Sequence, residues 1–401
     1  MFKHHSCASD TYLPSSSSSS SSSIVLGTFL SCIETPCPLI RLTHGSPLYS
    51  TKDLVLEFPL NFLGQLEMAD ILTLNKTTDS KQVTADLLHR PSNQRNVISA
   101  RHMEVGVTST TSRGMSINLL SGRQILSHEE YIQILINEQP KSIIDYEGSG
   151  SSKGNGSDGV YVIISMGDEV PFNSSQKRYS KAIERTDQWF KELRSCDKIN
   201  WHNTFLFGIV QGSVDDLSNV GHIARERIQD GANGIAIGGS GMGESIDTLN
   251  RVIQEIRASV GNDIPILVQG INTVEDIISA AQNGADVVST NLPHILTTAG
   301  LAMCILGHGE VQMDNENRKK RKVKPATSPT YKVMNIKSYV NRTSSSPLQA
   351  SCHCHACRHY TRAYIYHLYK AHELLGEVLL YTHNQWQLFE LFRILRCNSK
   401  S

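Results

Sequence analysis

Short apolar runs alternate with amphipathic stretches over the second half of the chain. The runs are rich in β-branched residues, and the stretches between them repeat apolar positions with helical spacing. The predicted strands are Val160–Ser165, Phe205–Val210, Gly234–Ile237, Ile264–Gln269 and Asp286–Thr290, and the predicted helices span 175–195, 215–229, 244–260 and 272–283. A repeated strand–helix pattern fits a (β/α)8 barrel or a doubly wound sheet, and the pattern alone does not choose between them.

The pattern before residue 160 is irregular. A serine tract, Ser15–Ser23, cannot bury enough apolar surface to offset chain entropy, so residues 1–40 are predicted to be disordered. The pattern then predicts a short strand over Leu54–Phe58 and a helix over Ser127–Glu138. A linker or insertion is expected at 311–345, where the basic run Arg318–Lys322 is either a solvated loop, a phosphate contact or a nuclear signal.

Composition narrows the class of protein. Lys and Arg number 38 and Asp and Glu also number 38, so the net charge of +0 gives no global attraction to nucleic acid. No apolar run approaches the roughly 20 residues that a membrane-spanning helix needs. Nine cysteines, mostly scattered, make a poor disulfide framework and indicate a reducing compartment. These features predict a soluble globular protein without a transmembrane segment.

The most specific motif is Cys352-x-Cys354-x-x-Cys357, which is followed by His383 on a predicted helix, Glu373–Arg396. Three thiolates and one imidazole form a closed tetrahedral zinc site of the structural kind, with no open position for a catalytic water. His383 is favoured as fourth ligand because it shares a helical face with apolar residues. The histidines that compete with it are His353, His355, His359, His367 and His372.

The segment from Cys352 to Asn384 reads CHCHACRHYTRAYIYHLYKAHELLGEVLLYTHN. It resembles the C-terminal zinc segment of the queuine tRNA-ribosyltransferase (tRNA-guanine transglycosylase) family, and upstream segments such as Phe207–Gly212 and Gly234–Gly239 resemble strand ends of that family's barrel. The resemblance covers roughly residues 160–395. It implies an α/β fold, a (β/α)8 TIM barrel with a C-terminal zinc-binding helical subdomain, and one structural Zn2+ on Cys352, Cys354, Cys357 and His383.

The resulting domain prediction has four parts. A disordered Ser-rich N-terminus covers 1–40, and a transglycosylase-like barrel covers 41–310. The linker or insertion covers 311–345, and the zinc-binding subdomain covers 346–401. The resemblance also implies base-pocket positions at strand ends, namely Asp168, Gln211, Gly238, Gly239 and Glu244.

Two departures from the family's pattern concern catalysis. Ser289 stands where the family has its nucleophilic Asp, and the family's D-S-G-G-F-Q strand end is absent. A carboxylate can trap an oxocarbenium-like ribosyl centre as an ester, whereas a serine hydroxyl needs an activating base. The resemblance is therefore to the accessory, non-catalytic subunit 2 of the eukaryotic enzyme.

That resemblance implies a heterodimer with a catalytic queuine tRNA-ribosyltransferase subunit that binds the tRNA anticodon arm. The reaction is exchange of guanine for queuine at the wobble position of tRNAs with GU(N) anticodons, for aspartate, asparagine, histidine and tyrosine. The implied location is the cytoplasm, with peripheral association at the mitochondrial outer membrane as a further expectation. Candidate phosphate contacts near the zinc segment are Arg358, Arg362, Lys370, Arg393 and Arg396.

Two other functions remain open at this stage. The chain could be an active transglycosylase in which Asp286 or Glu169 replaces the missing nucleophile. It could also be a stand-alone zinc-stabilised RNA-binding protein that never meets a transglycosylase. Dependence of activity on a partner chain distinguishes these alternatives from the accessory subunit.

Overall fold

The computed structural model of the chain describes residues 3–4, 27–30, 33–58, 61–77, 94–102, 110–111, 113–119, 121–139, 161–213, 215–306 and 329–398. The chain divides into two compact units. The first unit comprises Met1–Pro47 and Asn61–Asn291, and the second comprises Leu48–Leu60 and Leu292–Ser401. The serine tract and the basic run at 318–324 lie outside the described residues.

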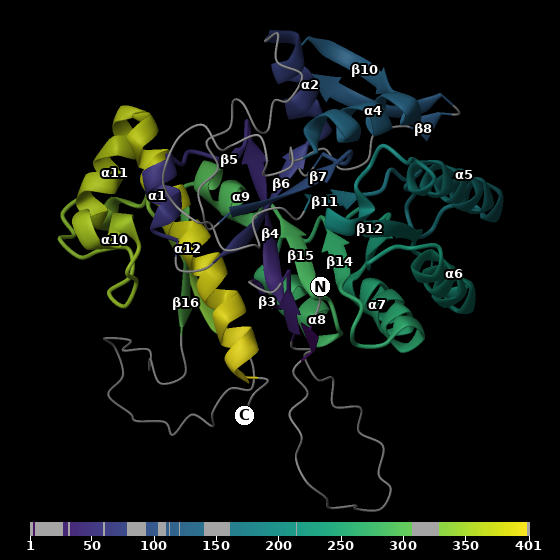
Figure 1. The fold of residues 1–401 in the computed structure, drawn as a ribbon. Helices are drawn as coiled ribbons and strands as arrows, with labels where there is room; N and C mark the ends of the chain where they lie inside the picture. The colour runs from purple at the N-terminus through teal and green to yellow at the C-terminus, as the bar shows by residue number, and fades with distance from the viewer. Residues whose placement is uncertain are drawn as a thin grey trace, which may run out of the picture. The chain divides into compact units, whose positions relative to one another are not determined.

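The first unit is built around a closed barrel of eight parallel strands (Figure 1). In spatial order they are β4 (Cys37–Thr43), β6 (Phe62–Glu67), β7 (Gln94–Ser99), β11 (Tyr161–Ile164), β12 (Thr204–Gln211), β13 (Gly234–Gly238), β14 (Ile266–Gln269) and β15 (Val287–Thr290). Pairing of β15 with β4, with Ser289 opposite Leu39, closes the cylinder. The predicted (β/α)8 barrel is thus confirmed, and the doubly wound alternative is excluded.

Apolar side chains from all eight strands fill the barrel interior. Successive side chains on a strand point to opposite faces, so each strand sends one set inward and one outward to the helices. Because both faces are covered, the strands read as nearly continuous apolar runs. Leu30 and Ile33, which precede the barrel strands in the sequence, join the inward cluster. Its members from the strands are Cys37, Leu39, Leu63, Val97, Val162, Ile164, Phe205, Phe207, Ile209, Ala236, Leu267 and Val287.

Helices follow the strands and cover the barrel, as Figure 1 shows for α5 to α7. They are α2 (Met68–Thr77), α5 (Gln176–Arg194), α6 (Leu217–Gln229), α7 (Ile246–Val260) and α8 (Val274–Gln282). Asp216, Ser245 and Thr273 cap the last three of these helices, each accepting a hydrogen bond from a backbone N–H of the first turn. The predicted helices at 175–195, 215–229, 244–260 and 272–283 are therefore confirmed.

Two small antiparallel sheets accompany the barrel in the first unit. One contains β1 (Lys3–His4), β2 (Gly27–Phe29) and β3 (Ile33–Thr35), and the other contains β8 (Thr110–Thr111), β9 (Gly114–Leu119) and β10 (Gly122–Leu126). The tiny β5 (Ser46–Pro47) pairs with β4. Helix α4 (His128–Glu138) follows β10 and begins with a capping box between Ser127 and Glu130, as the sequence predicts.

The second unit contains a two-stranded sheet and a set of helices. The strands are β16 (Leu301–Leu306) and β17 (Thr330–Asn335), and the helices are α1 (Lys52–Leu56), α9 (Leu292–Ala299), α10 (His355–His359), α11 (Arg362–Ala371) and α12 (Leu374–Asn398). Side chains of α12 bind the backbone of β16: Asn384 bonds both Met303 and Leu301, and Gln387 accepts from Ile305 N at 2.7 Å. The side chains of α12 thereby supply hydrogen-bond partners for those backbone groups of β16 that are not paired with β17.

The N-terminal boundary of the fold corrects the prediction of disorder through residue 40. β4 begins at Cys37, and Leu39 in this strand is fully buried inside the barrel. The serine tract dominates the composition of the first 40 residues and hides the apolar positions that follow residue 32.

The strand predicted over Leu54–Phe58 is wrong, because this segment contains α1. Thr51 caps the helix, and the buried positions are Val55 and Phe58, which lie three residues apart. Alternating Leu54, Leu56 and Phe58 suggested a strand, but five residues are too few to separate the two periods.

Part of the segment predicted as a linker, 311–345, is regular structure. β17 pairs antiparallel with β16, with Val333 opposite Met303. Its side chains are mostly exposed or half-buried, so the strand lacks the apolar alternation by which sequence analysis finds strands.

Within the described ranges, no helix is both long enough and apolar enough to cross a membrane.

The pH dependence of stability should reveal the buried His128. Its ring stacks on Trp189, and its Nδ1 lies 2.9 Å from Glu192 Oε2. Burial lowers the pKa of His128 although Glu192 acts in the opposite direction. The unfolded chain therefore takes up this proton first, and stability falls as the pH drops below about 6.5. We expect the Tm of His128→Asn to fall less between about pH 7 and pH 5 than the Tm of the native chain does.

The matched control is His222→Asn, which removes an exposed histidine from α6. Its melting temperatures should follow the native pH profile. Equal slopes for His128→Asn and the native chain would show that His128 does not titrate differently in the folded state.

Candidate functional site

The carboxyl ends of the barrel strands bring together a layer of buried polar side chains. Such side chains normally stay at the surface, and in a barrel this end is where substrates bind. The layer, here called the barrel mouth, consists of Gln65, Arg101, Asp168, Glu169, Gln211, Ser240, Gln269 and Ser289. It contains four of the residues singled out from the sequence, Asp168, Glu169, Gln211 and Ser289.

Asp168 follows β11, but its carboxylate is bound by arginines of α5. Arg178 forms a bidentate pair with it, with N–O distances of 2.8 and 2.5 Å, and Arg185 contacts the Oδ2 atom as well. The backbone N–H of Asp168 donates to Thr186 Oγ1. Both carboxylate oxygens are therefore engaged by cations of the neighbouring helix.

Glu169 and Arg101 form a buried ion pair inside the mouth. Arg101 Nη1 lies 2.7 Å from Glu169 Oε2, and both side chains are almost completely buried. The same carboxylate oxygen accepts the backbone N–H of Gly239 at 2.8 Å, and Arg101 Nη2 donates to the carbonyl of Ser240. Charge-assisted hydrogen bonds of this kind fix both side chains tightly.

Gln211 at the end of β12 is paired with the backbone of Val170. Its Oε1 accepts from Val170 N at 3.1 Å, and its Nε2 donates to Val170 O at 2.6 Å. This amide–backbone pair uses the same donor and acceptor that would address a planar ligand edge. Gln211 therefore joins two strand ends to each other.

Gly238 ends β13 and Gly239 follows it, and both allow neighbouring segments to approach closely. Gly239 has φ +80°, and a Cβ atom there would lie 2.1 Å from Val170 O. Only glycine fits this left-handed, crowded position. Glu244 lies farther along the loop, where it accepts the N–H groups of Gly241 and Met242 at 2.6 and 2.9 Å. It shapes the loop rather than the mouth.

Ser289 lies on β15 and is buried. Its hydroxyl donates to Gln65 Oε1 at 3.4 Å, a long contact with an amide rather than with a base. A serine needs a neighbouring base to become a nucleophile. The geometry therefore gives Ser289 a weakly bound hydroxyl and no activating contact with a carboxylate or imidazole of the described residues.

Asp286, considered from the sequence as a substitute nucleophile, lies before the start of β15. Its carboxylate pairs with Arg257 of α7 and accepts Ile266 N at the amino end of β14. Burial raises the pKa of Asp286 to about 6, and Arg257 lowers it in part. Asp286 thus occupies the end of the barrel opposite the mouth, where barrel residues serve stability.

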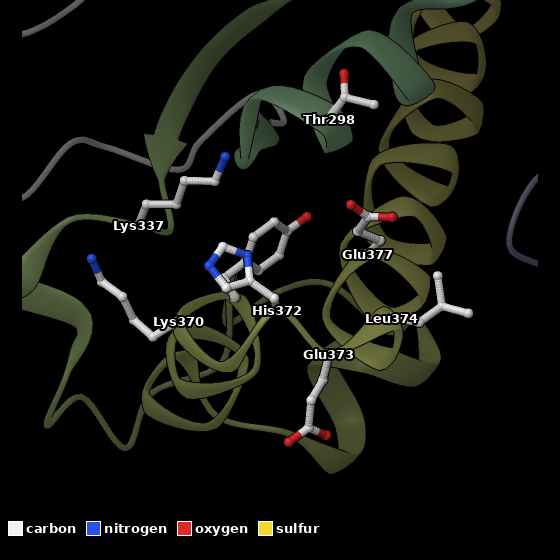
Figure 2. Close-up of a pocket in the computed structure, with 8 residues that line it drawn as sticks. Thr298, Lys337, Lys370, His372, Glu373, Leu374 and Glu377 are labelled. Atoms are coloured by element: carbon white, nitrogen blue, oxygen red, sulfur yellow. The ribbon is translucent and has the colours of Figure 1, made fainter.

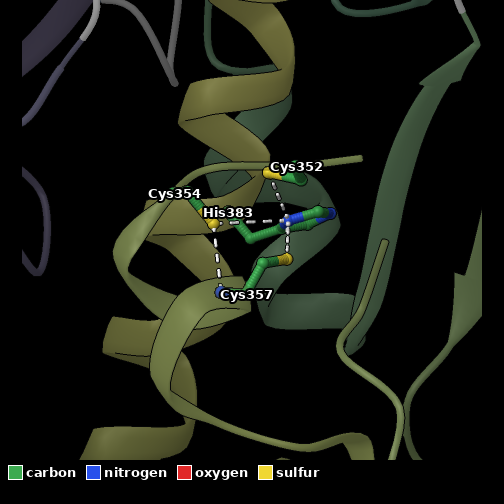
Figure 3. Close-up of side chains that lie close together, drawn as sticks. All are labelled: Cys352, Cys354, Cys357 and His383. Atoms are coloured by element: carbon green, nitrogen blue, oxygen red, sulfur yellow. Dashed lines mark hydrogen bonds between the residues drawn. The ribbon is translucent and has the colours of Figure 1, made fainter. Parts of the chain in front are cut away.

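A candidate metal centre lies in the second unit. Cys352, Cys354, Cys357 and His383 bring their ligand atoms within 4.8 Å of one another (Figure 3). The distances from His383 Nδ1 to the three Sγ atoms are 3.6, 3.7 and 3.3 Å. A tetrahedral zinc ion with typical bond lengths would set these distances at about 3.5 Å. The group could therefore hold a metal ion without rearrangement.

Contacts around the four ligands orient them. His383 Nε2 lies 2.8 Å from the carbonyl of Met303, so the ring donates there and leaves Nδ1 free to bind a metal. The backbone N–H of Cys357 points to Cys354 Sγ at 3.4 Å. Hydrogen bonds from the thiols of Cys354 and Cys357 lower the pKa of Cys352, which favours the thiolate that a metal requires.

The structure brings His383, rather than a competing histidine, to the three cysteines. His355, for example, pairs with Glu57 at 3.3 Å. His372 ends α11 in a left-handed conformation and lines a separate cavity. His383 is completely buried.

That cavity has a volume of about 430 Å³ and is shown in Figure 2. It is lined by Thr298, Lys337, Tyr369, Lys370, His372, Glu373, Leu374 and Glu377. Lys337 and Lys370 each lie over a tyrosine ring, and two glutamates balance their charge. The mixture of charges defines no ligand class.

The basic residues predicted to meet phosphate mostly have partners within the second unit. Arg358 binds Glu57 at 2.6 Å, and Arg393 binds Glu390. Arg362 donates to the carbonyls of Pro347 and Leu348, and Arg396 is buried. Both residues therefore stabilise the subdomain, and the burial of Arg396 corrects its assignment as a surface phosphate contact.

Sequence reasoning missed the arginines that pair with the carboxylates of the barrel mouth. Arg101 follows β7, and Arg178 and Arg185 lie seven residues apart on α5. The spacing places the last two on one helical face, which was a usable signal. Nothing near Arg101 in the sequence indicates that it is buried.

Comparison with known proteins identifies relatives over the barrel and the metal centre. The profile of the Queuine tRNA-ribosyltransferase family matches residues 156–398. Three bacterial proteins named queuine tRNA-ribosyltransferase are similar. The one from Prochlorococcus marinus (strain MIT 9313) is 31% identical over 235 residues, which cover 57% of this chain and 54% of the relative.

The protein from Aeromonas hydrophila is 29% identical over 234 residues, covering 56% of this chain and 53% of the relative. The protein from Azoarcus sp. (strain BH72) is 28% identical over 225 residues, with coverage of 56% and 53%. The chain thus spans about half the length of the curated relatives that it matches.

Removing one ligand of the metal centre should remove the metal and destabilise the second unit. We expect Cys354→Ser to lose its bound ion, zinc being the one to measure first because the ligands are three thiolates and an imidazole. Loss of a structural metal lowers the unfolding free energy by about 4 kcal/mol or more. Elemental analysis and thermal melting check this expectation.

The control is Cys397→Ser, which changes an exposed cysteine at the end of α12. It should keep the native metal content and Tm. If Cys354→Ser and the native chain contained equal metal and melted together, the four residues would not form a metal centre.

Proposed function

This chain belongs to the queuine tRNA-ribosyltransferase family, and we propose that it is the non-catalytic subunit of a heterodimeric tRNA-guanine transglycosylase. In this proposal a catalytic partner subunit carries the nucleophile, and the present chain supports binding of the tRNA anticodon arm. The reaction is exchange of guanine for queuine at the wobble position of tRNAs with GU(N) anticodons.

The observation that carries the proposal is the state of the barrel mouth. By the family's pattern the nucleophilic carboxylate would stand at Ser289, whose hydroxyl instead donates to an amide oxygen, that of Gln65. Base exchange at a ribose needs a group that forms and releases a covalent bond to C1′, as glycosidase carboxylates do. A hydroxyl without a base does this poorly.

The internal pairing of the mouth supports the same conclusion. Asp168 is neutralised by Arg178 and Arg185, and Gln211 is paired with Val170. Groups that already have partners must break those contacts before they can bind a base, which costs free energy. The proposal therefore assigns base recognition as well as chemistry to the partner subunit.

The metal centre has a structural role in the proposal. Cys352, Cys354, Cys357 and His383 would hold one Zn2+ with all four positions filled by protein, so no position is open for substrate. Zinc would supply folding energy to α10, α11 and α12 rather than chemistry. The location we propose is the cytoplasm, with peripheral association at the mitochondrial outer membrane.

The names of the bacterial relatives favour a second candidate, an active transglycosylase. In this chain it would have to use Glu169 as nucleophile. One oxygen of that carboxylate, Oε2, is bound by Arg101 and by Gly239 N, and these two hydrogen bonds lower its nucleophilicity. The stand-alone RNA-binding protein has no specific observation in its favour.

Incorporation of labelled guanine into a GUN-anticodon tRNA tests the proposal. We expect no turnover from the present chain alone and turnover from its mixture with a catalytic subunit that exceeds what that subunit gives alone. The physical reason is that the reactive carboxylate is supplied in only one of the two barrels.

Ser289→Asp is the informative variant, because it restores a carboxylate without clearing the mouth. It should stay inactive alone, since Arg101 and Glu169 still fill the space where a base would bind. Turnover by the native chain without a partner would overturn the proposal and point to Glu169.

A further inference from the structure

The guanidinium group of Arg101 is held as a ligand would be held. It lies at the carboxyl ends of the strands, is almost completely buried, and is bound by a carboxylate and a backbone carbonyl. Its own backbone is fixed as well, because Arg101 N donates to Ser99 Oγ and Arg101 O accepts Gln65 Nε2 at 2.9 Å. The side chain therefore has a defined place in the mouth rather than a range of positions.

The acceptors around Arg101 match one chemical unit. Glu169 Oε2 and the Ser240 carbonyl take N–H groups from adjacent nitrogens of a planar N–C–N system. The edge of guanine formed by N1–H and the 2-amino group is the same planar N–C–N unit with two donors. A site that binds one of these edges is complementary to the other.

Two buried polar atoms in this layer lack a hydrogen-bond partner among the described residues. They are Glu169 Oε1 and Gln269 Nε2, an acceptor and a donor. Glu169 and Gln269 are each at least nine-tenths buried, so water does not compensate for the missing bonds at the surface. The layer thus offers more hydrogen bonds than Arg101 uses, as expected for a site whose shape was set by a larger ligand.

We propose that Arg101 is an internal occupant of a guanidine-recognising site, and that this side chain keeps nucleobases out of the barrel mouth. Arg101 is thereby a specificity-determining residue: it makes the barrel unable to bind the base that its acceptors suit. The choice of guanine as the excluded ligand rests on the proposed function, whereas the occupied guanidine site rests on the contacts alone.

Binding of guanine to Arg101→Ala tests the inference directly. Removing the side chain frees Glu169 and the Ser240 carbonyl, so we expect the variant to bind guanine at least about tenfold more tightly than the native chain does. Hypoxanthine lacks the 2-amino group and should bind more weakly than guanine. Calorimetry and the ligand-induced rise in Tm measure both.

The guanidinium ion is a second probe that does not depend on the proposed function. At concentrations far below those that unfold proteins, it should raise the Tm of Arg101→Ala above that in an equal concentration of sodium chloride. If guanidinium raises the Tm of the variant and guanine does not, the guanidine site is supported and the choice of guanine as its excluded ligand is wrong. If native partner-dependent turnover is absent, the proposed function fails by itself.

The matched control is Arg257→Ala. It also removes a guanidinium, here a partly buried one, from a buried carboxylate, Asp286, but at the opposite end of the barrel. Guanine should not raise the Tm of this variant, because the space left by Arg257 lies between α7 and β14 and lacks the acceptors of the barrel mouth.

Three results would overturn the inference. The native chain could bind guanine as well as the variant, the folded variant could bind neither guanine nor guanidinium, or hypoxanthine could bind as well as guanine. If Arg101→Ala does not fold alone, the same question is tested by refolding the variant in the presence of each ligand and measuring the recovery of folded protein. Recovery with guanine or guanidinium but not with hypoxanthine supports the site, and recovery with none of them overturns it.

Discussion

Closure of the barrel is the constraint on which the rest of the first unit depends. Once β15 pairs with β4, the polar side chains of the barrel mouth are enclosed with little access to water. Each enclosed donor or acceptor without a partner costs about 1–3 kcal/mol, and an unpaired charge costs more. Within the layer, the pairs Arg101–Glu169 and Gln211–Val170 offset this desolvation cost. The arginines of α5 offset it for Asp168. Which groups remain available to a ligand follows from these pairings.

Helix α12 has the corresponding role in the second unit. Within two turns it supplies a ligand of the metal centre, His383, and two amides, Asn384 and Gln387, that bind the backbone of β16. His383 also contacts β16 through the Met303 carbonyl. A metal ion on this helix would therefore hold the strand as well as the three cysteines. This dual role explains why α12 buries polar residues and lacks a simple apolar stripe.

The sequence was sufficient where a local pattern determines the structure. β11 to β15 and the helices between them have clear periods, and the cysteine spacing specifies a ligand set. It was insufficient where long-range contacts decide. Whether Arg101 is buried depends on Glu169, which is 68 residues away, and on Ser240, which is 139 residues away. α1 and β17 were missed because one is too short to show a period and the other is too exposed.

The replaced nucleophile and the filled mouth have a common physical explanation under the proposed function. A barrel that binds a base must keep a carboxylate and several amides desolvated but unpaired, which lowers its stability in exchange for affinity. A subunit that leaves the chemistry to its partner has no need to bear this cost. An internal cation such as Arg101 then stabilises the empty barrel by giving Glu169 a permanent counter-charge. Loss of the nucleophile at position 289 and filling of the pocket by Arg101 would accordingly evolve together. Without a nucleophile an open base pocket has no use, and with a filled pocket a nucleophile has none.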